Sequence, residues 1–297
     1  MCSANQQYSW ATGSLLHWAK ESLESKGIDS PRLTAEILLS HALGCSRVQL
    51  QTRHDQAVAA DETKTFLAGL ERRLQHEPLQ HIIGEAEFMG LSFHVDGRVL
   101  VPRPETEVLV EEVLRIAQTQ PRERRITVLD VGTGSGNIAV AIAKVLKQSQ
   151  IFALEIDPAA LKVTEMNVRR HAVSHQVTAM QRDIFQPLES LEAQSFDFVV
   201  ANPPYVSSEE FLLLPPEVGK YEPRIATCDE GDGLKFFPRL ADVGSLLLRP
   251  GGWIVVETAY NQRDAVTEMF FSRGYESVKA VKDYSGNQRV VEARKRP

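Results

Sequence analysis

Residues 126–146 read ITVLDVGTGSGNIAVAIAKVL, and this stretch decides the class of fold. Its first six residues form an apolar, β-branched run that is typical of a buried strand. Gly132, Gly134 and Gly136 then stand at every second position, and glycine permits the positive φ angles that a sharp turn needs. Ala, Ile and Val dominate the remainder, which predicts a buried helix. The pattern is therefore a strand, a glycine turn and a helix.

The chain repeats this order downstream. The segment 151–168, IFALEIDPAALKVTEMNV, again predicts a strand followed by a helix, and 196–204, FDFVVANPP, predicts a buried strand that ends in a loop. Further strands are predicted near 253–259 and 289–294. Strands that alternate with helices imply a mainly parallel sheet with helices on both faces. We therefore predict an α/β fold with a doubly wound sheet.

The first 85 residues have a different pattern. Apolar residues recur there at helical spacing, as Leu15, Ala19 and Leu23 do, and the segment contains no chemical motif. Its predicted structure is a small helical bundle, and recognition of a partner is the only task that its sequence suggests.

A hairpin is predicted to join the two parts. Leu91, Phe93 and Val95 alternate with polar residues, and Asp96-Gly97 follows, a pair that favours a tight hairpin turn. A helix opens at Pro104. We predict a helical domain at 1–85, a hairpin linker at 86–103 and a core domain at 104–297.

The glycine turn is a candidate cofactor site, because it brings the backbone close to a ligand at a helix N-terminus. The dinucleotide fingerprint G-x-G-x-x-G requires a third glycine at the position that Asn137 occupies. The spacing G-x-G-x-G instead resembles that of S-adenosylmethionine-dependent methyltransferases. The candidate cofactor-binding residues of this motif are Asp130, Gly132, Thr133, Gly134, Ser135 and Gly136, and Asn202, further along the chain, is another candidate.

Two acidic residues extend this candidate site. Glu155 ends the second predicted strand, where a carboxylate can accept hydrogen bonds from both hydroxyls of a ribose. Asp183 resembles the methyltransferase residue that meets the adenine amino group, with Ile184 beside the ring. Alone, the glycine motif also fits a structural turn or a nucleotide site, but with these residues it favours S-adenosylmethionine. Asp157 is either a second ribose contact or the cap of the helix that begins at Pro158.

The tetrapeptide Asn202-Pro203-Pro204-Tyr205 indicates the chemistry. Two prolines cannot continue a strand, so they form a rigid loop at the carboxyl edge of the sheet, where open α/β sheets bind ligands. The Asn202 side-chain oxygen and the Pro203 carbonyl can accept both N–H groups of a planar nitrogen, and Tyr205 offers a flat wall. Such positioning aims the nitrogen lone pair at a sulfonium methyl. The motif predicts methylation of an sp² nitrogen, which belongs either to a glutamine amide or to the amino group of adenine or cytosine.

Composition excludes several other classes. The 297 residues include 33 Lys+Arg and 39 Asp+Glu, a net charge of −6, which argues against a protein that holds nucleic acid mainly through its phosphates. Three cysteines are too few for a disulfide framework or a zinc site, and we expect no metal. The opening MCSANQQYSW lacks the apolar core of a signal peptide, and no run reaches the roughly 18 apolar residues of a membrane span. We expect a cytoplasmic monomer with no membrane partner and no direct nucleic-acid partner.

Together these motifs resemble the HemK/PrmC family, the glutamine N5-methyltransferases of peptide chain release factors. The resemblance covers nearly the whole chain and includes SPRLTAEILLSHALG (30–44), EPLQHIIGEAEFMGLSFHVDGRVLVPRPETE (77–107), VLDVGTGSGNIA (128–139), ANPPYV (201–206), YEPRIATCDEGDGL (221–234) and YSGNQRVVEAR (284–294). PRPETE, directly ahead of the core, is the most specific of these, because adenine methyltransferases of DNA do not carry it.

The resemblance implies a seven-stranded S-adenosylmethionine-dependent methyltransferase core. It implies that the acceptor is the glutamine of a Gly-Gly-Gln motif in release factors, held by NPPY, and that the helical domain helps to dock the release factor. Further residues are implied close to the active site, namely Arg103, Glu105 and Glu107, with Glu222 and Arg224 as supports. The two acids at 105 and 107 equally fit stabilisation of a helix N-terminus.

The chain departs from the family pattern in four places. Glu155 replaces the more usual Asp, Ile184 replaces a frequent aromatic residue, and Thr258-Ala259 stands where Ile-Gly is usual. The segment RIATCDEGDGL (224–234) is less regular than the common glycine-rich form. None of these touches NPPY, so the predicted reaction stands. The alternative is an amino-methyltransferase acting on adenine or cytosine of nucleic acid. A third hypothesis is an inactive adaptor that binds the cofactor and is held to release factors by its helical domain.

Overall fold

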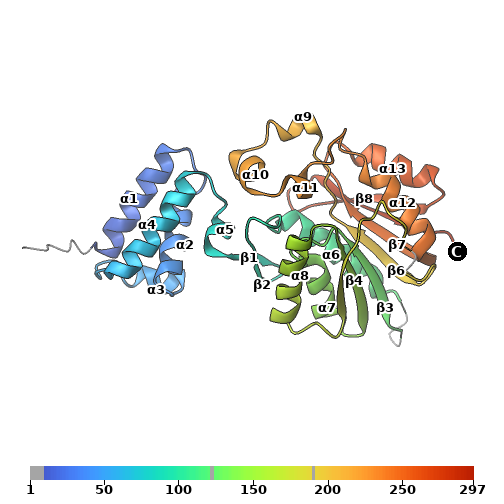
Figure 1. The fold of residues 1–297 in the computed structure, drawn as a ribbon, viewed down its shortest axis with the longest axis horizontal. Helices are drawn as coiled ribbons and strands as arrows, with labels where there is room; N and C mark the ends of the chain where they lie inside the picture. Colours follow the sequence, from blue (N-terminus) through green and yellow to red (C-terminus); the bar gives the residue numbers. More distant parts are fainter. Residues whose placement is uncertain (1–9, 121–123, 189–190) are drawn as a thin grey trace, which may run out of the picture. The chain divides into compact units, whose positions relative to one another are not determined.

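The computed structural model describes residues 10–120, 124–188 and 191–297, which divide into two compact units (Figure 1). The helical unit contains the described part of residues 1–84 together with Pro216–Tyr221, and the sheet unit contains Glu85–Pro215 and Glu222–Pro297. Cys2 and the first nine residues, on which the expectation about a leader depends, lie outside the described residues. Cys45 and Cys228 are both free thiols.

The predicted helical bundle is confirmed. Its helices are α1 (Thr12–Ser25), α2 (Pro31–Ala42), α3 (Arg47–Gln51), α4 (Ala60–Leu74), α5 (Leu79–Ile83) and α10 (Pro216–Tyr221). Leu15, Ala19 and Leu23 are fully buried in its core, as their spacing predicts. Helix α10 comes from a segment that the sequence suggested for the core domain. Glu217 of α10 pairs with Arg73 of α4 at 3.1 Å, which ties α10 into this unit.

The hairpin predicted around Asp96-Gly97, with a second arm at 99–101, was wrong, and a different hairpin lies just before it. Strands β1 (Glu85–Phe88) and β2 (Leu91–His94) pair in antiparallel register around Met89-Gly90, where both φ angles are positive as a tight turn demands. Asp96 instead accepts hydrogen bonds from the backbone and guanidinium groups of Arg98. Because Asp96 is engaged in this local contact, the segment after it forms no second arm of a hairpin.

The sheet unit contains a seven-stranded sheet in the order β5-β4-β3-β6-β7-β9-β8, as the predicted fold class requires. The first five strands of this order are parallel, and β9 is antiparallel to both β7 and β8. The strands are β3 (Ile126–Val131), β4 (Ser149–Glu155), β5 (Val177–Gln181), β6 (Phe196–Ala201), β7 (Leu248–Glu257), β8 (Glu276–Lys282) and β9 (Gln288–Arg294). The sequence did not locate β8, because ESVKAVK carries more charge than the buried strands.

Helices cover both faces of this sheet (Figure 1). The hairpin packs with α6 (Pro104–Ala117), α7 (Asn137–Val145) and α8 (Pro158–Arg170) on one face. The opposite face is covered by α12 (Phe236–Leu247) and α13 (Arg263–Ser272). Two short helices, α9 (Ser208–Phe211) and α11 (Arg224–Thr227), lie in the long connection between β6 and α12. Alternate residues of the central strands enter the two cores, as Val128 and Leu129 do.

The strand order determines where a ligand can bind. The chain runs outward from β3 to β4 and β5, and then returns to place β6 on the other side of β3. Such a reversal opens a crevice at the carboxyl ends of the strands beside it. Both sequence motifs, the glycine turn after β3 and NPPY after β6, stand at this edge. Among the described residues, no helix is long and apolar enough to cross a membrane.

Candidate active site

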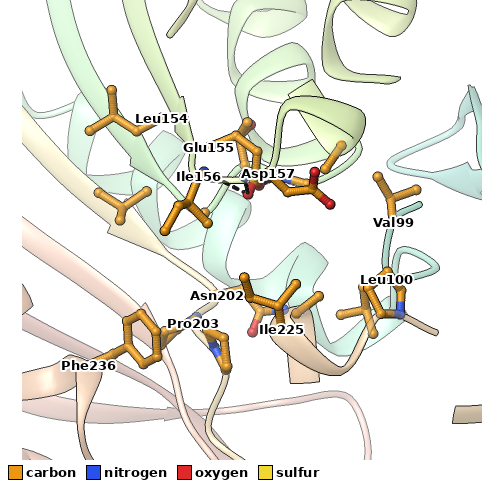
Figure 2. A pocket seen from close by; sticks show the side chains of 18 of the residues that line it. Val99, Leu100, Leu154, Glu155, Ile156, Asp157, Asn202, Pro203, Ile225 and Phe236 are labelled. Atoms are coloured by element: carbon orange, nitrogen blue, oxygen red, sulfur yellow. Dashed lines mark hydrogen bonds between the residues drawn. The ribbon is translucent and has the colours of Figure 1, made fainter. Parts of the chain in front are cut away.

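A cavity of about 560 Å³ lies at this edge of the sheet unit (Figure 2). Its size is within the range of small-molecule sites, roughly 300–1,000 Å³. Figure 2 shows Glu155 and Asp157 on one side of the cavity and Asn202 with Pro203 on the other. The predicted site residues that line it are Arg103, Gly132, Thr133, Gly134, Ser135, Glu155, Asp183, Ile184, Asn202, Pro203 and Pro204. The two motifs, 66 residues apart from Gly136 to Asn202, therefore share one cavity.

The glycine turn lies directly between β3 and α7. Gly132, Gly134 and Gly136 all have positive φ angles, of 71°, 56° and 80°. A Cβ atom on Gly136 would stand 3.0 Å from the Thr164 side chain of α8, so a side chain there would be both strained and crowded. The Gly134 carbonyl accepts the Thr164 hydroxyl at 2.7 Å. The turn is thus held in shape against α8.

Asp130 supports the glycine turn from beneath. It is fully buried in β3 and accepts the Thr133 hydroxyl at 2.7 Å, and it does not line the cavity. Burial raises the pKa of this carboxyl to about 7, because the charged form loses its solvation. The structure thus places Asp130 as a support of the turn.

Glu155, at the end of β4, connects this strand to the glycine turn. Its carboxylate accepts the Gly134 N–H at 2.9 Å and the N–H groups of Ile156 and Asp157 at 2.9 and 3.0 Å. Burial raises its pKa, and these backbone donors oppose that rise. Each carboxylate oxygen has two lone pairs, so the group keeps capacity for one further hydrogen bond, at Oε2. Asp157 accepts the Ala159 N–H at 2.8 Å, so the structure shows the helix cap.

The far end of the cavity contains an aromatic pair that the sequence did not indicate. Asp183 accepts the Phe185 N–H at 2.9 Å, and Ile184 is buried beside it. The rings of Phe185 and Phe236 meet edge to face with centroids 5.2 Å apart, and both residues line the cavity. A planar aromatic ligand group fits such a wall. Phe236 lies 53 residues beyond Asp183, so no local motif connects them.

Asn202, Pro203 and Pro204 line the cavity opposite Glu155, while Tyr205 is directed elsewhere. The Tyr205 hydroxyl donates to Glu257 at 3.0 Å, and its carbonyl accepts the Gln262 side-chain N–H at 2.7 Å. Burial, followed by the Glu257 charge, raises the pKa of the Tyr205 phenol, so the phenol keeps its proton. The loop is therefore anchored to the end of β7 at Tyr205.

Sequence reasoning missed two further residues of this loop's support, Thr106 and Glu257. The Asn202 side-chain N–H donates to the Thr106 hydroxyl at 3.1 Å, and that hydroxyl donates to Glu257 at 2.6 Å. Thr106 and Glu257 are each 1% exposed. Glu257 could have been found from the sequence, because it ends the apolar strand WIVVE and a buried carboxylate needs hydrogen-bond partners. Thr106, inside PRPETE between two acids, carried no such indication.

Of the predicted charged residues Arg103, Glu105 and Glu107, the first lines the cavity and the other two do not. Arg103 lines the cavity and pairs with the buried carboxylate of Glu222 at 2.7 Å, which also accepts the Val101 N–H at 3.1 Å. Burial raises the pKa of Glu222, and the Arg103 charge opposes this. Glu107 accepts the Met89 N–H at 2.6 Å, which secures the hairpin turn. The cavity lining contains neither Glu105 nor Glu107.

Arg224 has its own partners. It lines the cavity, pairs with Glu230 at 2.6 Å and lies over the Phe211 ring at 4.2 Å. The predicted supports Glu222 and Arg224 therefore both belong to the loop that borders the cavity.

These residues fit a bulky ligand with a sugar and an aromatic ring. The cavity offers a buried carboxylate at Glu155, a glycine turn that lets a ligand approach the backbone, and an aromatic wall. Asn202 and the Pro203 carbonyl can accept hydrogen bonds from a second molecule at the opposite side. A site of this kind can hold a donor and an acceptor nitrogen in one geometry.

Comparison with known proteins finds separate matches for the helical unit and for part of the sheet unit. The model of the PrmC N-terminal domain matches residues 14–84, and the model of the methyltransferase small domain matches residues 106–213. The release factor glutamine methyltransferase of Geobacter sulfurreducens is 39% identical over 96% of this chain and 97% of its own length. That of Rhodopirellula baltica is 37% identical over 99% of this chain and 100% of its own length.

A solved structure shares the fold of the sheet unit. The N-terminal domain of human METTL16 in complex with SAH matches with a TM-score of 0.50 at 18% identity, and the match covers 70% of this chain and 76% of that one. At this identity the likeness concerns the fold alone.

Proposed function

The chain belongs to the release factor glutamine methyltransferase family, and on that premise we propose that it transfers a methyl group from S-adenosylmethionine to the side-chain amide nitrogen (N5) of the glutamine in the Gly-Gly-Gln motif of peptide chain release factors. The observation that carries the proposal is the shared cavity, in which Asn202 and Pro203 face the glycine turn and Glu155. This arrangement puts an amide-holding loop opposite a nucleoside-holding one.

The glycine turn and Glu155 hold the methyl donor. S-adenosylmethionine supplies an electrophilic methyl group on a sulfonium. The Glu155 carboxylate is the acceptor for a ribose hydroxyl, through the remaining lone pair of Oε2, and its longer side chain keeps the function of the more usual Asp. Asp183 is the acceptor for the adenine amino group, and Ile184 packs beside the ring. Asp130 acts through Thr133, since its carboxyl is fully buried below the turn.

Asn202 and Pro203 hold the methyl acceptor. The Asn202 side-chain oxygen and the Pro203 carbonyl accept the two N–H groups of the glutamine amide. With both protons held, the nitrogen lone pair is directed at the donor side of the cavity, and positioning of this kind supplies most of the catalysis. Pro204 stiffens the loop because its φ angle is restricted. Hydrogen bonds that favour a pyramidal nitrogen offset the loss of amide resonance.

The proton balance needs no strong base. As the N–C bond to the methyl group forms, the bond from sulfur to methyl breaks and its electron pair stays on sulfur, and the nitrogen becomes acidic enough to release its proton to water. Tyr205 keeps its own proton at neutral pH, so its part is structural. Arg103, held by Glu222, borders the cavity and is suited to contact the backbone of the release factor. Glu105 and Glu107 support the helix start and the hairpin.

The helical unit is proposed to dock the release factor, since its core is built without any chemical motif. We further propose a cytoplasmic monomer that contacts no nucleic acid directly. The net charge of −6 supports this, because the enzyme has no surplus of positive charge for phosphates.

Transfer of a labelled methyl group tests the proposal. The full chain is incubated with labelled S-adenosylmethionine and either a release factor or DNA and RNA of mixed sequence. Label in the release factor alone is expected. Label in nucleic acid alone would establish the amino-methyltransferase alternative, and no label anywhere, with cofactor binding intact, would favour the inactive adaptor.

A further inference from the structure

Glu257 and Thr106 form a buried relay that reaches Asn202 from behind. Glu257 ends β7 and accepts hydrogen bonds on both oxygens, one from Thr106 at 2.6 Å and one from Tyr205 at 3.0 Å. Thr106 lies in the first turn of α6 and accepts the Asn202 side-chain N–H at 3.1 Å. Three separate elements thus meet behind the acceptor loop. Nothing in the reaction as proposed above uses Glu257 or Thr106.

The direction of each hydrogen bond follows from the number of protons available. A threonine hydroxyl has one proton, and here that proton is donated to Glu257. The Thr106 oxygen can then only accept from Asn202. An asparagine side chain has an N–H end and an oxygen end, so placing the N–H end on Thr106 turns the oxygen end toward the other side.

We infer that Glu257, acting through Thr106, sets the orientation of the Asn202 amide and thereby makes the acceptor site selective for a carboxamide over a carboxylate. This inference rests on the proposed function and names the residues that give the site its preference. With the Asn202 oxygen and the Pro203 carbonyl both presented as acceptors, the site matches the two N–H groups of glutamine. A glutamate carboxylate, which has only acceptors at neutral pH, meets two acceptors and is rejected.

Local charges are consistent with Glu257 as an acceptor. Burial raises the pKa of Glu257, and the hydrogen bonds from Thr106 and Tyr205 and the charge of Arg289 on β9 oppose that rise. The Tyr205 proton is also directed to Glu257, so the same carboxylate fixes both ends of NPPY. Glu257 and Thr106 are therefore positioning residues rather than catalytic ones.

The test uses a matched pair of variants in the full chain. Thr106→Val has nearly the same shape but removes the hydroxyl, and Thr106→Ser keeps the hydroxyl. We expect T106V to lower kcat on a release factor by about 10- to 100-fold, because the half-buried Asn202 loses the partner of its side-chain N–H. T106S should recover kcat to within about threefold of wild type. The Kd for S-adenosylmethionine should be the same in all three proteins.

A second readout separates orientation from general damage. A release factor whose acceptor glutamine is replaced by glutamate is tested as a competitive inhibitor. In wild type this glutamate variant should bind poorly. In T106V, its inhibition constant divided by the KM of the unchanged release factor should fall by about 10-fold, because the freed Asn202 can turn its N–H groups toward the carboxylate. A merely loosened site would bind both release factors less well.

The outcomes are distinct. T106V with wild-type kcat and wild-type discrimination would overturn the inference, as would equal loss of kcat in T106S with an unchanged Tm. If T106V does not fold, Glu257→Gln replaces it in the test. The glutamine amide can donate to Thr106, so the Asn202 amide is no longer held in one orientation. Unchanged discrimination between glutamine and glutamate in E257Q would then overturn the inference. Failure of wild type to methylate any release factor would instead contradict the proposed function itself.

Discussion

The two sides of the cavity are built from different kinds of contact. On the donor side, the Gly134 N–H is held by Glu155 only 21 residues away, and Thr164, 30 residues away, secures the same turn. On the acceptor side, Asn202 is held by Thr106 across 96 residues, and Thr106 by Glu257 across 151. The contacts that hold the glycine turn thus come from residues within 30 positions of it, whereas the acceptor loop is held only when the whole sheet is assembled.

This difference predicts that the two functions can be lost separately. The donor side should tolerate damage to the acceptor loop and the reverse, because they share a cavity but no described hydrogen bond joins Asn202 to the glycine turn.

Asn202→Ala should break the acceptor side alone. Removing a group that holds the reacting nitrogen should lower kcat by at least about 100-fold, by analogy with loss of one oriented hydrogen-bonding group at other active sites. The Kd for S-adenosylmethionine, measured by calorimetry, should stay within about twofold. Asn261→Ala removes the same amide from an exposed position and serves as the control. Equal loss of cofactor affinity in N202A would show that the two sides are not separable.

Glu155→Ala should break the donor side alone. A carboxylate that accepts one ribose hydroxyl contributes about 1.5–3 kcal/mol, so the Kd for S-adenosylmethionine should rise by about 10- to 100-fold. At saturating cofactor, kcat should fall far less than in N202A. Glu165→Ala, on the exposed side of α8, is the matched control. A fall in kcat with an unchanged Kd would place Glu155 outside the donor site.

Asp130 should make the stability of the folded chain depend on pH. Its pKa is about 7 in the folded state against 3.8 for an ordinary aspartate, so the folded chain retains a proton that the unfolded chain releases within this window. Its contribution to the free energy of unfolding therefore falls as pH rises from about 4 to about 7, by about 2 kcal/mol between pH 5 and pH 7. Urea unfolding of wild type and Asp130→Asn at both pH values measures this.

The control for that measurement is Asp264→Asn, which removes an exposed carboxylate. The difference in the free energy of unfolding between D130N and wild type should change with pH, and D264N reports the effect of the same replacement at the surface. A constant difference for D130N would mean that Asp130 is ionised throughout.

Gly136→Ala tests how tightly the glycine turn packs against Thr164 of α8. Forcing a side chain into a φ of 80° costs about 1 kcal/mol, and the contact with Thr164 at 3.0 Å should add about 1 kcal/mol. Gly274→Ala has a φ of 84° but open space around it, so it isolates the first cost. Chemical unfolding should therefore show G136A to be the less stable variant by about 1 kcal/mol. Equal stability would show that Thr164 moves aside freely.

The same contrast explains what the sequence predicted. The strand at Ile126–Val131, the glycine turn and Glu155 follow from local patterns, since periodicity and glycine spacing report contacts near in the chain. The hairpin turn was misplaced because Asp96-Gly97 is the stronger turn pair by composition, whereas Met89 accepts a positive φ and Glu107 holds its N–H.

The remaining features depend on assembly. Thr106, Glu257 and Phe236 reach the cavity or its support only through the strand order, which no local pattern encodes. Helix α10 is a further case, because Glu217 finds Arg73 144 residues earlier in the chain. The glycine motif and NPPY therefore indicated where the site lies, but not how the Asn202 side chain is oriented.

Localising the methyl group in a release factor tests the central claim most directly. After incubation with S-adenosylmethionine and the full chain, tandem mass spectrometry of the release factor should find one methyl group, on the side-chain nitrogen of the Gly-Gly-Gln glutamine, and none after incubation with N202A. A methyl group on another residue, or equal methylation by N202A, would contradict the account.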